Sequence, residues 1–348
     1  MNIDFFNAGC ADAIHINFLG NDEKPHNILI DGGSEKGDAY IDTLRERIHD
    51  IINVKKEIID IWIITHIDDD HIGGILRLLK DTELLKAVDL CRTTFWFNYS
   101  VWDYDSGFRN NNLKNVKQGI TLRNYLIENS NIKENITDDD HVIDLWGAKT
   151  TILSPDNKSY NALLKVWENE EIKLRQPEVS SRKKTRKNDY KIKIEDFDIT
   201  KEVKDNSEEN GSSIAFILEY NGEAILFSAD SHPWVLASSI SRISNGNKLK
   251  LKYMQMPHHG SRYNTNNTLL QLIDCEDYII SADGYNRSNL PNKETFIKVL
   301  KANPDKVVNF HITQENDLTQ NIFKIDEDVQ INLIFPKKGS NHLHFTLG

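Results

Sequence analysis

Cysteines and long apolar runs are scarce in this sequence, and each scarcity excludes a class of protein. The three cysteines, Cys10, Cys91 and Cys275, lie far apart and have no C-x-x-C spacing, which excludes a disulfide framework and a cysteine-rich zinc site. No stretch approaches the roughly 20 apolar residues that span a bilayer. The N-terminus also lacks a basic segment followed by a long apolar one, as in a secretion signal. We therefore expect a soluble, cytoplasmic protein with no membrane association.

Basic residues are also in deficit, with 42 Lys and Arg against 53 Asp and Glu and a net charge of −11. This deficit argues against a protein that coats nucleic acid with a broad basic surface, although a local cleft is not excluded. Hydrophobic residues make up 39% and charged residues 27%, the balance of an ordinary globular protein. We predict one domain over residues 1–348.

Apolar patterns alternate between strand and helix periods, which favours an α/β layered fold. Three short segments, 3–7, 13–18 and 27–30, are predicted to form an antiparallel meander. The apolar run 59–65 predicts a buried strand, and 72–79 then has helical spacing. Residues between these two elements are therefore expected on a strand-to-helix loop, where catalytic groups commonly lie.

The same patterns predict the remaining elements. Strands are expected at 94–98, 150–153, 214–220, 224–228, 251–255 and 278–281, and helices at 39–52, 113–128, 162–170, 233–243, 265–273 and 293–301.

The stretch 171–210 breaks this alternation. Its 180–187 part is basic and nearly free of apolar residues, and its 195–209 part is acidic. One interpretation is a mobile, solvated insertion in the domain, and the other is a basic lid that guides a phosphate-bearing substrate.

Potential metal ligands are concentrated in the run His66-Ile67-Asp68-Asp69-Asp70-His71. Imidazole and carboxylate groups are ligands for zinc and manganese. The run directly follows a predicted buried strand, and Gly73 and Gly74 come just behind it, where small residues would let the next helix begin close by. A solvated acidic loop needs neither feature, so the run predicts a metal site.

This run resembles the H-x-[HD]-x-D-H signature of the metallo-β-lactamase superfamily. It is most similar to the branch that includes the extracytoplasmic domain of the DNA-uptake channel ComEC. Four other segments resemble that branch: 5–13, 28–33, 225–230 and 256–261, the last with the sequence Met-Pro-His-His-Gly-Ser. Asn7, Cys10 and Leu290 depart from its usual pattern. The resemblance implies a four-layer αββα sandwich and a hydrolase with two divalent metal ions, Zn or Mn.

The resemblance also implies the roles of individual residues. His66 and Asp68 would hold one metal, Asp70 and His71 would hold the second, and Asp230 would bridge both.

A late histidine would complete the second site. We take His259 as this ligand and His258 as a donor to the substrate oxygen that gains charge, although the sequence leaves the choice open. The first site then lacks a fourth strong ligand, so we expect it to bind its metal less tightly than the second. His141 and Asn210 are candidates for the missing ligand. Ser261 and Asn210 are further candidates to face the substrate.

Asp12 and Asp31 lie in turns that match the same branch. We expect them to hydrogen-bond the metal-binding histidines and fix their orientation. Without metal, the clustered carboxylates should repel one another, so Asp70→Asn is expected to leave the metal-free chain as stable as before or more so.

Hydrolysis by a hydroxide shared between two metals, oriented by Asp70, is the expected reaction. The ComEC resemblance and the basic segment favour a phosphodiester in nucleic acid or a nucleotide. The alternative is a non-catalytic subunit that binds a protein partner in a multi-protein assembly.

Overall fold

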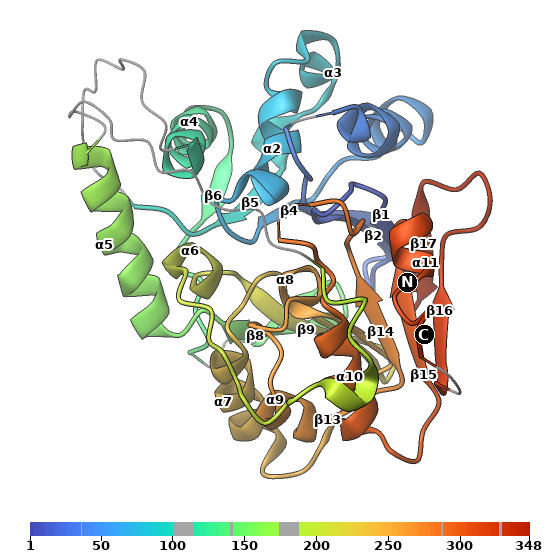
Figure 1. Cartoon of the computed structure of the whole chain (residues 1–348). Coiled ribbons are helices and arrows are strands. Elements are labelled where there is room, and N and C mark those ends of the chain that lie inside the picture. The colour runs from blue at the N-terminus through green and yellow to red at the C-terminus, as the bar shows by residue number, and fades with distance from the viewer. Residues whose placement is uncertain (36, 101–113, 140–141, 174–187, 287, 327–328) are drawn as a thin grey trace.

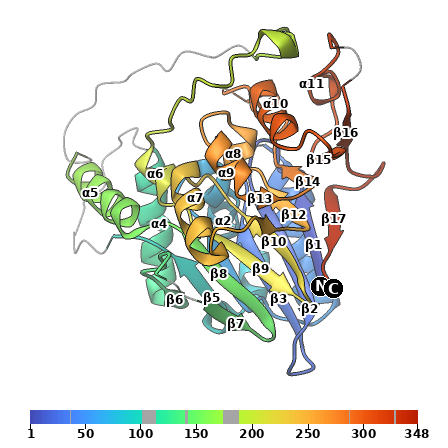
Figure 2. The same ribbon diagram turned by 90° about the horizontal axis from the view of Figure 1, so that it is seen from below.

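Two large β-sheets lie face to face, and helices cover the outer face of each (Figures 1 and 2). The computed structural model describes residues 1–35, 37–100, 114–139, 142–173, 188–286, 288–326 and 329–348. This is the four-layer αββα sandwich that the sequence predicted. Within the described residues, no helix has the length and apolar character needed to cross a membrane.

Among the described residues, the first sheet has seven strands. Their order is β17 (His342–Thr346), β1 (Asn2–Phe6), β2 (Ala13–Leu19), β3 (Pro25–Asp31), β4 (Ile61–Ile64), β5 (Thr94–Phe97) and β6 (Asn131–Lys133).

The second sheet has eight strands over the same part of the chain. Their order is β16 (Ile331–Ile334), β15 (Val308–Ile312), β14 (Asp277–Ile280), β12 (Tyr253–Gln255), β10 (Glu223–Phe227), β9 (Ala215–Tyr220), β8 (Ala148–Ser154) and β7 (Val142–Leu145). A separate pair is formed by β11 (Leu249–Lys250) and β13 (Ile273–Asp274).

The helices fall into two groups. Over the first sheet and beside it are η1 (Ile41–Arg45), α1 (Glu46–His49), η2 (Asp50–Val54), α2 (Asp69–Leu78), α3 (Thr82–Ala87), η3 (Leu90–Arg92), α4 (Lys114–Asn129) and α5 (Asn157–Lys173). The remainder are η4 (Ile194–Asp196), α6 (Glu208–Gly211), α7 (Pro233–Ser244), α8 (Pro257–Gly260), α9 (Asn267–Gln271), α10 (Lys293–Ala302) and α11 (Asp317–Gln320).

Strand β4 shows why the layers form. Ile61 and Ile63 pack in the core between the sheets, whereas Trp62 and Ile64 pack on the other side against the helices. Every residue of the strand is therefore buried, which explains its unbroken apolar sequence. A parallel strand covered on both faces requires this composition.

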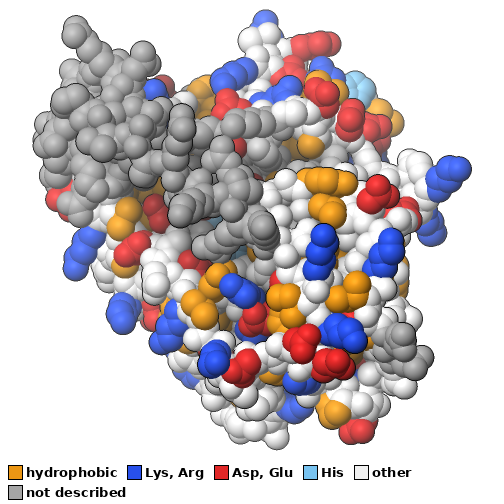
Figure 3. Space-filling view, viewed as in Figure 1, with side chains coloured by type: hydrophobic (Ala, Val, Ile, Leu, Met, Phe, Trp, Pro, Cys, Tyr) orange, Lys and Arg blue, Asp and Glu red, His pale blue; other side chains and the backbone are white. Residues whose placement is uncertain are grey.

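Charge on the surface is mixed. In the face shown in Figure 3, blue Lys and Arg side chains lie among red Asp and Glu side chains over the lower half of the molecule.

The described part of the predicted insertion packs against the body. Asp189 accepts hydrogen bonds from the backbone N–H groups of Lys293 and Glu294 at 2.8 and 3.1 Å. The buried Tyr190 hydroxyl donates to the Pro291 carbonyl at 2.9 Å. Asp189 and Tyr190 are thus attached to α10 and the residues just before it, which the polar composition of the segment did not indicate. The basic residues 180–187 lie outside the described residues.

Candidate metal centre

The candidate ligands follow the carboxyl ends of strands in both sheets. β3 ends at Asp31, and β4 ends at Ile64, just before His66. In the facing sheet, Asp230 follows β10, and His258 and His259 follow β12. Both β4 and β12 pair in parallel with their neighbours. Residues distant in sequence therefore meet at one edge of the sandwich, as ligands do in open α/β sheets.

The sequence predicted that the motif lies on a loop, and this is only partly correct. Asp68 is extended, with φ −71° and ψ 148°, and α2 begins at Asp69. Asp70 and His71 therefore lie in the first turn of the helix. Negative side chains are favoured in this turn because unpaired N–H groups give the helix N-terminus a partial positive charge.

Gly73 and Gly74 let α2 contact the turn after β3, as the sequence suggested. A Cβ at Gly74 would lie 1.8 Å from the Gly32 carbonyl oxygen, and one at Gly73 would lie 2.0 Å from the Glu35 nitrogen. Any side chain at either position would push the helix away from the turn. The two glycines thereby fix His71 against Asp31.

Three candidate residues have left-handed backbones that non-glycine residues rarely adopt. Their φ angles are +53° at Asp31, +49° at His258 and +54° at His259. Ala229, next to Asp230, has φ +43°. Strain of this kind costs about 1–3 kcal/mol per residue and persists where the surrounding structure imposes it, which is typical of functional sites.

Four histidines surround the Asp230 carboxylate. Around its Oδ2, His66 Nε2 lies at 3.7 Å and His258 Nε2 at 3.5 Å. Asp68 Oδ2 lies 3.9 Å from His66 Nε2. We call His66, Asp68 and His258, together with Asp230 Oδ2, the first half-site.

The second half-site is formed around Asp230 Oδ1 by His71, His259 and Asp70. His71 Nε2 lies 3.4 Å and His259 Nε2 3.7 Å from this oxygen. Asp70 Oδ2 lies 3.3 Å from His259 Nε2. One carboxylate thus links two sets of donors.

The other ring nitrogen of each histidine is held by an oxygen. Nδ1 of His71 contacts Asp31 Oδ2 at 2.7 Å, and Nδ1 of His259 contacts the Ser281 carbonyl at 2.9 Å. Nδ1 of His258 contacts Asn264 Oδ1 at 2.9 Å. Nδ1 of His66 contacts the Thr65 hydroxyl at 3.2 Å. Carboxylate and carbonyl oxygens only accept, and the Thr65 hydroxyl donates to Asp31 Oδ2 at 2.6 Å, so it accepts from His66. Each Nδ1 therefore carries a proton, and in the neutral ring Nε2 keeps its lone pair.

The donors at the centre have no hydrogen-bond partner. Among the described residues, Nε2 of His66, His71 and His259 and Oδ1 of Asp230 are buried and unpaired. Buried polar atoms are normally paired because desolvation without a bond is costly. Convergence of unpaired nitrogens on an unpaired carboxylate oxygen fits bound cations.

Asp12 is closer to the second half-site than expected. One donor atom each from Asp12, His71, Asp230 and His259 lies within 4.8 Å of the others, and all four residues are buried. Asp12 Oδ2 lies 4.0 Å from His71 Nδ1. Asp12 is therefore placed to act as a ligand, whereas Asp31 makes the expected supporting hydrogen bond to His71.

Burial and charge shift the histidine pKa values in opposite directions. Burial, assisted by the neighbouring His71, lowers the pKa of His66 to about 3. Burial also opposes charge on His258, but the carboxylates of Asp230 and Asp205 outweigh it and raise the pKa of His258 to about 9. Without a cation, protons on His258 therefore compensate part of the negative charge.

The motif carboxylates differ from one another. Burial and the nearby charge of Asp70 raise the pKa of Asp68 to about 7. Burial also acts to raise the pKa of Asp70, but His259, whose Nε2 lies 3.3 Å from Asp70 Oδ2, and the charge of His71 hold it below its usual value. Without metal, Asp70 is thus stabilised as an anion, and the repulsion expected from the sequence falls on Asp68.

Asp205 and Asn264 contact the centre but were missed in the sequence. Asp205 Oδ2 accepts from Asn210 Nδ2 at 2.7 Å and from Asn264 Nδ2 at 3.0 Å, and lies 3.5 Å from His258 Nδ1. Asp205 lies in the segment interpreted as an insertion, and no motif marks it. The prediction that Asn210 lies beside the centre agrees with its contact to His258 at 3.2 Å.

Two other candidates are placed differently. The Ser261 hydroxyl accepts from the Tyr263 N–H at 3.2 Å within the turn after the histidine pair, so its role toward a substrate stays a prediction. His141 lies outside the described residues.

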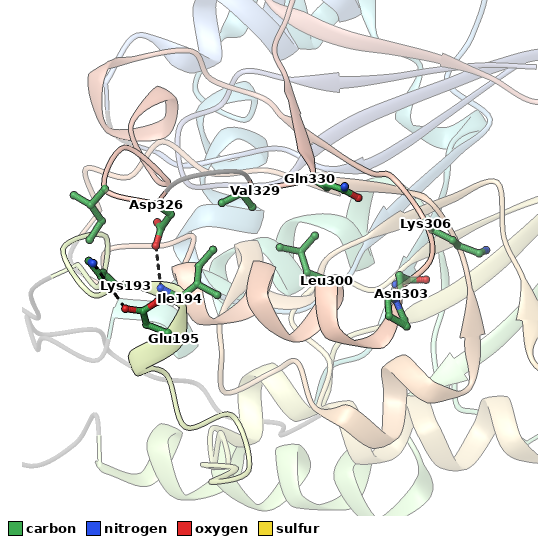
Figure 4. Close-up of a pocket in the computed structure, with 11 residues that line it drawn as sticks. Lys193, Ile194, Glu195, Leu300, Asn303, Lys306, Asp326, Val329 and Gln330 are labelled. Atoms are coloured by element: carbon green, nitrogen blue, oxygen red, sulfur yellow. Dashed lines mark hydrogen bonds and ion pairs between the residues drawn. The ribbon is translucent and has the colours of Figure 1, made fainter.

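A separate pocket of about 580 Å³ lies between η4, α10 and the approach to β16 (Figure 4). Its charged side chains have partners either within the lining or beside it, as Lys306 has in Asp274. Asp326 Oδ1 accepts from the Ile194 N–H at 2.9 Å, and Lys193 lies 3.8 Å from Glu195. We assign it no ligand.

No protein-family model matches the chain, and no curated protein matches it. Solved structures do resemble it. The metallo-β-lactamase fold protein YhfI from Bacillus subtilis has 10% identity and a TM-score of 0.44, with 99% of this chain and 98% of that chain covered.

Two other structures have comparable likeness. A diphosphatase of the PhnP family has 13% identity and a TM-score of 0.42, with 97% of this chain and 85% of that chain covered. CmlA, a diiron β-hydroxylase from Streptomyces venezuelae, has 11% identity and a TM-score of 0.41 over 99% of this chain. The chain spans 54% of the length of CmlA.

Proposed function

We propose that the chain is a metal-dependent hydrolase with two divalent cations, Zn²⁺ or Mn²⁺, and that it cleaves a phosphodiester. One observation carries this proposal: the Nε2 atoms of four histidines converge on the two oxygens of Asp230. Each ring is held through Nδ1, the arrangement that metal-binding histidines require.

The donor set assigns each cation its ligands. His66, Asp68, His258 and Asp230 would hold one cation. This assignment replaces the expectation that His258 donates to the substrate, because His258 Nε2 lies on the Oδ2 side of Asp230 together with His66. It also supplies the fourth ligand that the first site appeared to lack.

The second cation would be held by His71, His259 and Asp230, with Asp70 or Asp12 as the remaining carboxylate. Paired cations lower the pKa of a water molecule toward about 7 and stabilise charge on the attacked group.

The exposed side chains of the centre indicate the direction from which a substrate would approach. The side chains of Asp68, Asp70 and His258 are 25%, 35% and 24% exposed, whereas those of His66, His71 and His259 are at most 1% exposed. A substrate therefore reaches the centre from the side of the two aspartates and His258. Asp205 and Asn264 would keep the His258 ring in place during this approach.

A phosphodiester in nucleic acid or a nucleotide is favoured by two features of the sequence. The motif and the His-His-Gly-Ser segment resemble the ComEC branch, and the basic segment includes Arg182, Lys183, Lys184, Arg186 and Lys187. These five residues lie outside the described residues. We place this activity in the cytoplasm.

A hydrolysis screen tests the proposal. The full chain, stripped by chelator and reloaded with Mn²⁺ or Zn²⁺, is incubated with bis-p-nitrophenyl phosphate, single-stranded and double-stranded nucleic acid, cyclic nucleotides and lactones. We expect metal-dependent cleavage of a phosphodiester. The matched control is Asp230→Asn, prepared identically, which separates the activity from a contaminating nuclease.

Metal content gives the second readout. Two equivalents per chain with phosphodiester cleavage support the proposal. Cleavage of lactones alone would overturn the substrate class. Absence of bound metal and of activity would instead support a non-catalytic subunit with a protein partner.

A further inference from the structure

A second histidine cluster lies at the edge of the first sheet, on the strands that carry the two chain ends. Asp4 is on β1, and His342 and His344 are on the edge strand β17. Asp4 lies directly opposite His344 in the antiparallel register. β1 and β17 lie side by side in both ribbon views (Figures 1 and 2).

All three side chains leave the outer face of the sheet. Residues two apart in a strand point to the same side. Leu343 and Phe345 pack in the core between the sheets, so His342 and His344 face the opposite way. Asp4 is opposite in register and is buried on that same outer face, against Arg47 next to the sheet.

The donor atoms already surround a common point. Asp4 Oδ1 lies 2.7 Å from His344 Nδ1 and 3.7 Å from His342 Nε2. One donor atom from each residue lies within 4.8 Å of the other two. Ligands of a tetrahedral zinc ion, at bond lengths of about 2.0–2.2 Å, are separated by roughly 3.3 Å. Small side-chain rotations therefore bring the three atoms into coordinating positions.

Charge and exposure also suit a cation. Arg47 Nη1 contacts the other Asp4 oxygen, Oδ2, at 2.6 Å, which leaves Oδ1 to the histidines. His344 is 52% exposed, which gives a cation and a water ligand access from solvent.

We propose that Asp4, His342 and His344 form a third metal site, which binds Zn²⁺ with water as the remaining ligand. The cation joins the first strand of the chain to the last. Arg47 repels a cation, so this site binds more weakly than a centre with four protein ligands. The proposal does not depend on the function of the Asp230 centre.

Zinc counting tests this site on the full chain without a polyhistidine tag. Equilibrium dialysis against increasing free Zn²⁺ is followed by metal analysis of wild type, His342→Ala/His344→Ala and His49→Ala. His49 is an exposed histidine near Arg47 and serves as the matched control. We expect the double variant to bind one equivalent fewer, and His49→Ala to bind as many as wild type.

A second experiment uses the Asp230→Asn variant to separate zinc binding at this site from zinc binding at the Asp230 centre. In Asp230→Asn, added Zn²⁺ should still raise the melting temperature, and the rise should disappear when His344→Ala is added. Because His344 is half exposed, this single substitution leaves the fold intact. Equal zinc counts in wild type and the double variant, or an unchanged melting shift with His344→Ala, would overturn the proposal.

Discussion

The two half-sites around Asp230 have equal numbers of protein donors but different supports. In the second half-site, His71 is held by Asp31 at the end of β3, and His259 is held by the Ser281 carbonyl just after β14. In the first half-site, His258 is held by Asn264 and Asp205, which lie on loops. The same carboxylate thus joins a half-site fixed by the sheets to one fixed by loops.

This difference changes the reason for unequal metal binding. From the sequence, the first site was expected to be weaker because a ligand was missing. With His258 placed beside His66, we instead expect a weaker first site because His258 is 24% exposed, against 1% for His259, and because its supports lie on loops. We therefore expect ligand rigidity, and not ligand number, to set the order of affinity in this centre.

Asp230→Asn should have the largest effect because both half-sites share this residue. We expect this variant to lose the cations of the centre and its hydrolysis rate to fall by more than about 100-fold. Substitution of a residue that only supports a ligand typically costs about 10–100-fold. Metal analysis and turnover of bis-p-nitrophenyl phosphate measure both. Asp198→Asn, at a half-exposed surface carboxylate, is the control. If Asp230→Asn retained two cations at this centre, Asp230 would not be a ligand there.

Asp31→Asn and Asp205→Asn compare the supports directly. Asp31 accepts from the Thr65 N–H, the Thr65 hydroxyl and His71. In Asp31→Asn, the amide NH₂ group would face one of these donors and could not accept its hydrogen bond. For Asp31→Asn we expect the metal affinity of the second half-site to fall by about 10–100-fold. For Asp205→Asn we expect the affinity of the first half-site to fall by about 10-fold, the lower limit of that range.

A zinc titration measures these losses on a His342→Ala/His344→Ala background, which removes the proposed third site and leaves two steps. His66→Ala and His71→Ala on the same background serve as reference chains that assign each step. The comparison of supports fails if Asp205→Asn weakens the tighter step more than Asp31→Asn does.

Asp68→Asn and Asp70→Asn should shift the stability of the metal-free chain in opposite directions. The pKa of Asp68 is raised from its ordinary 3.8 to about 7, so this group costs the folded state stability progressively as the pH rises between these two values. Asp68→Asn should therefore raise the melting temperature at pH 8 and raise it less at pH 5. The lowered pKa of Asp70 means that its charge stabilises the fold, so Asp70→Asn should lower the melting temperature at both pH values.

Scanning calorimetry with chelator present measures these shifts. The earlier expectation for Asp70→Asn, no loss of stability, is thereby reversed. Stabilisation by Asp70→Asn at pH 8 would show that carboxylate repulsion dominates after all.

The smallest expected effect concerns the backbone of His258. Glycine adopts a φ of +49° without steric cost, whereas alanine does not. His258→Gly should therefore be about 1–2 kcal/mol more stable than His258→Ala in urea unfolding without metal. Both variants should lose the cation of the first half-site. Equal stabilities would mean that the backbone at this position relaxes when the ring is removed.

The sequence was most informative where local pattern and chemistry coincide. The unbroken apolar strand β4, the ligand run after it and the two close glycines all lie within 61–74, and each is found in the structure. His258 and His259 were also recognised, but which oxygen of Asp230 each one faces depends on the left-handed turn. That turn is set by packing between loops and strands.

The sequence was least informative for partners distant along the chain. Asp205 lies in an acidic stretch whose composition is that of a solvated segment, and its burial depends on Asn210, Asn264 and His258. Strands β15, β16 and β17 were not predicted. β16 is only partly buried and lacks a clear period. β17 alternates two outward-facing histidines with the buried Leu343 and Phe345, so its period of two could have identified it.

The contact between α2 and the turn after β3 has a consequence for local opening. Backbone N–H groups of Gly32 and Gly74 donate to the carbonyls of His71 and Gly33 at 2.7 and 2.8 Å. The Asp12 N–H donates to Asp70 at 3.1 Å. These three amides share one closed network, so none can exchange its hydrogen for deuterium unless helix and turn separate. Their exchange should therefore be slow and nearly equal, and should remain so after chelation, whereas amides around Asp205 should exchange faster once the cations are removed.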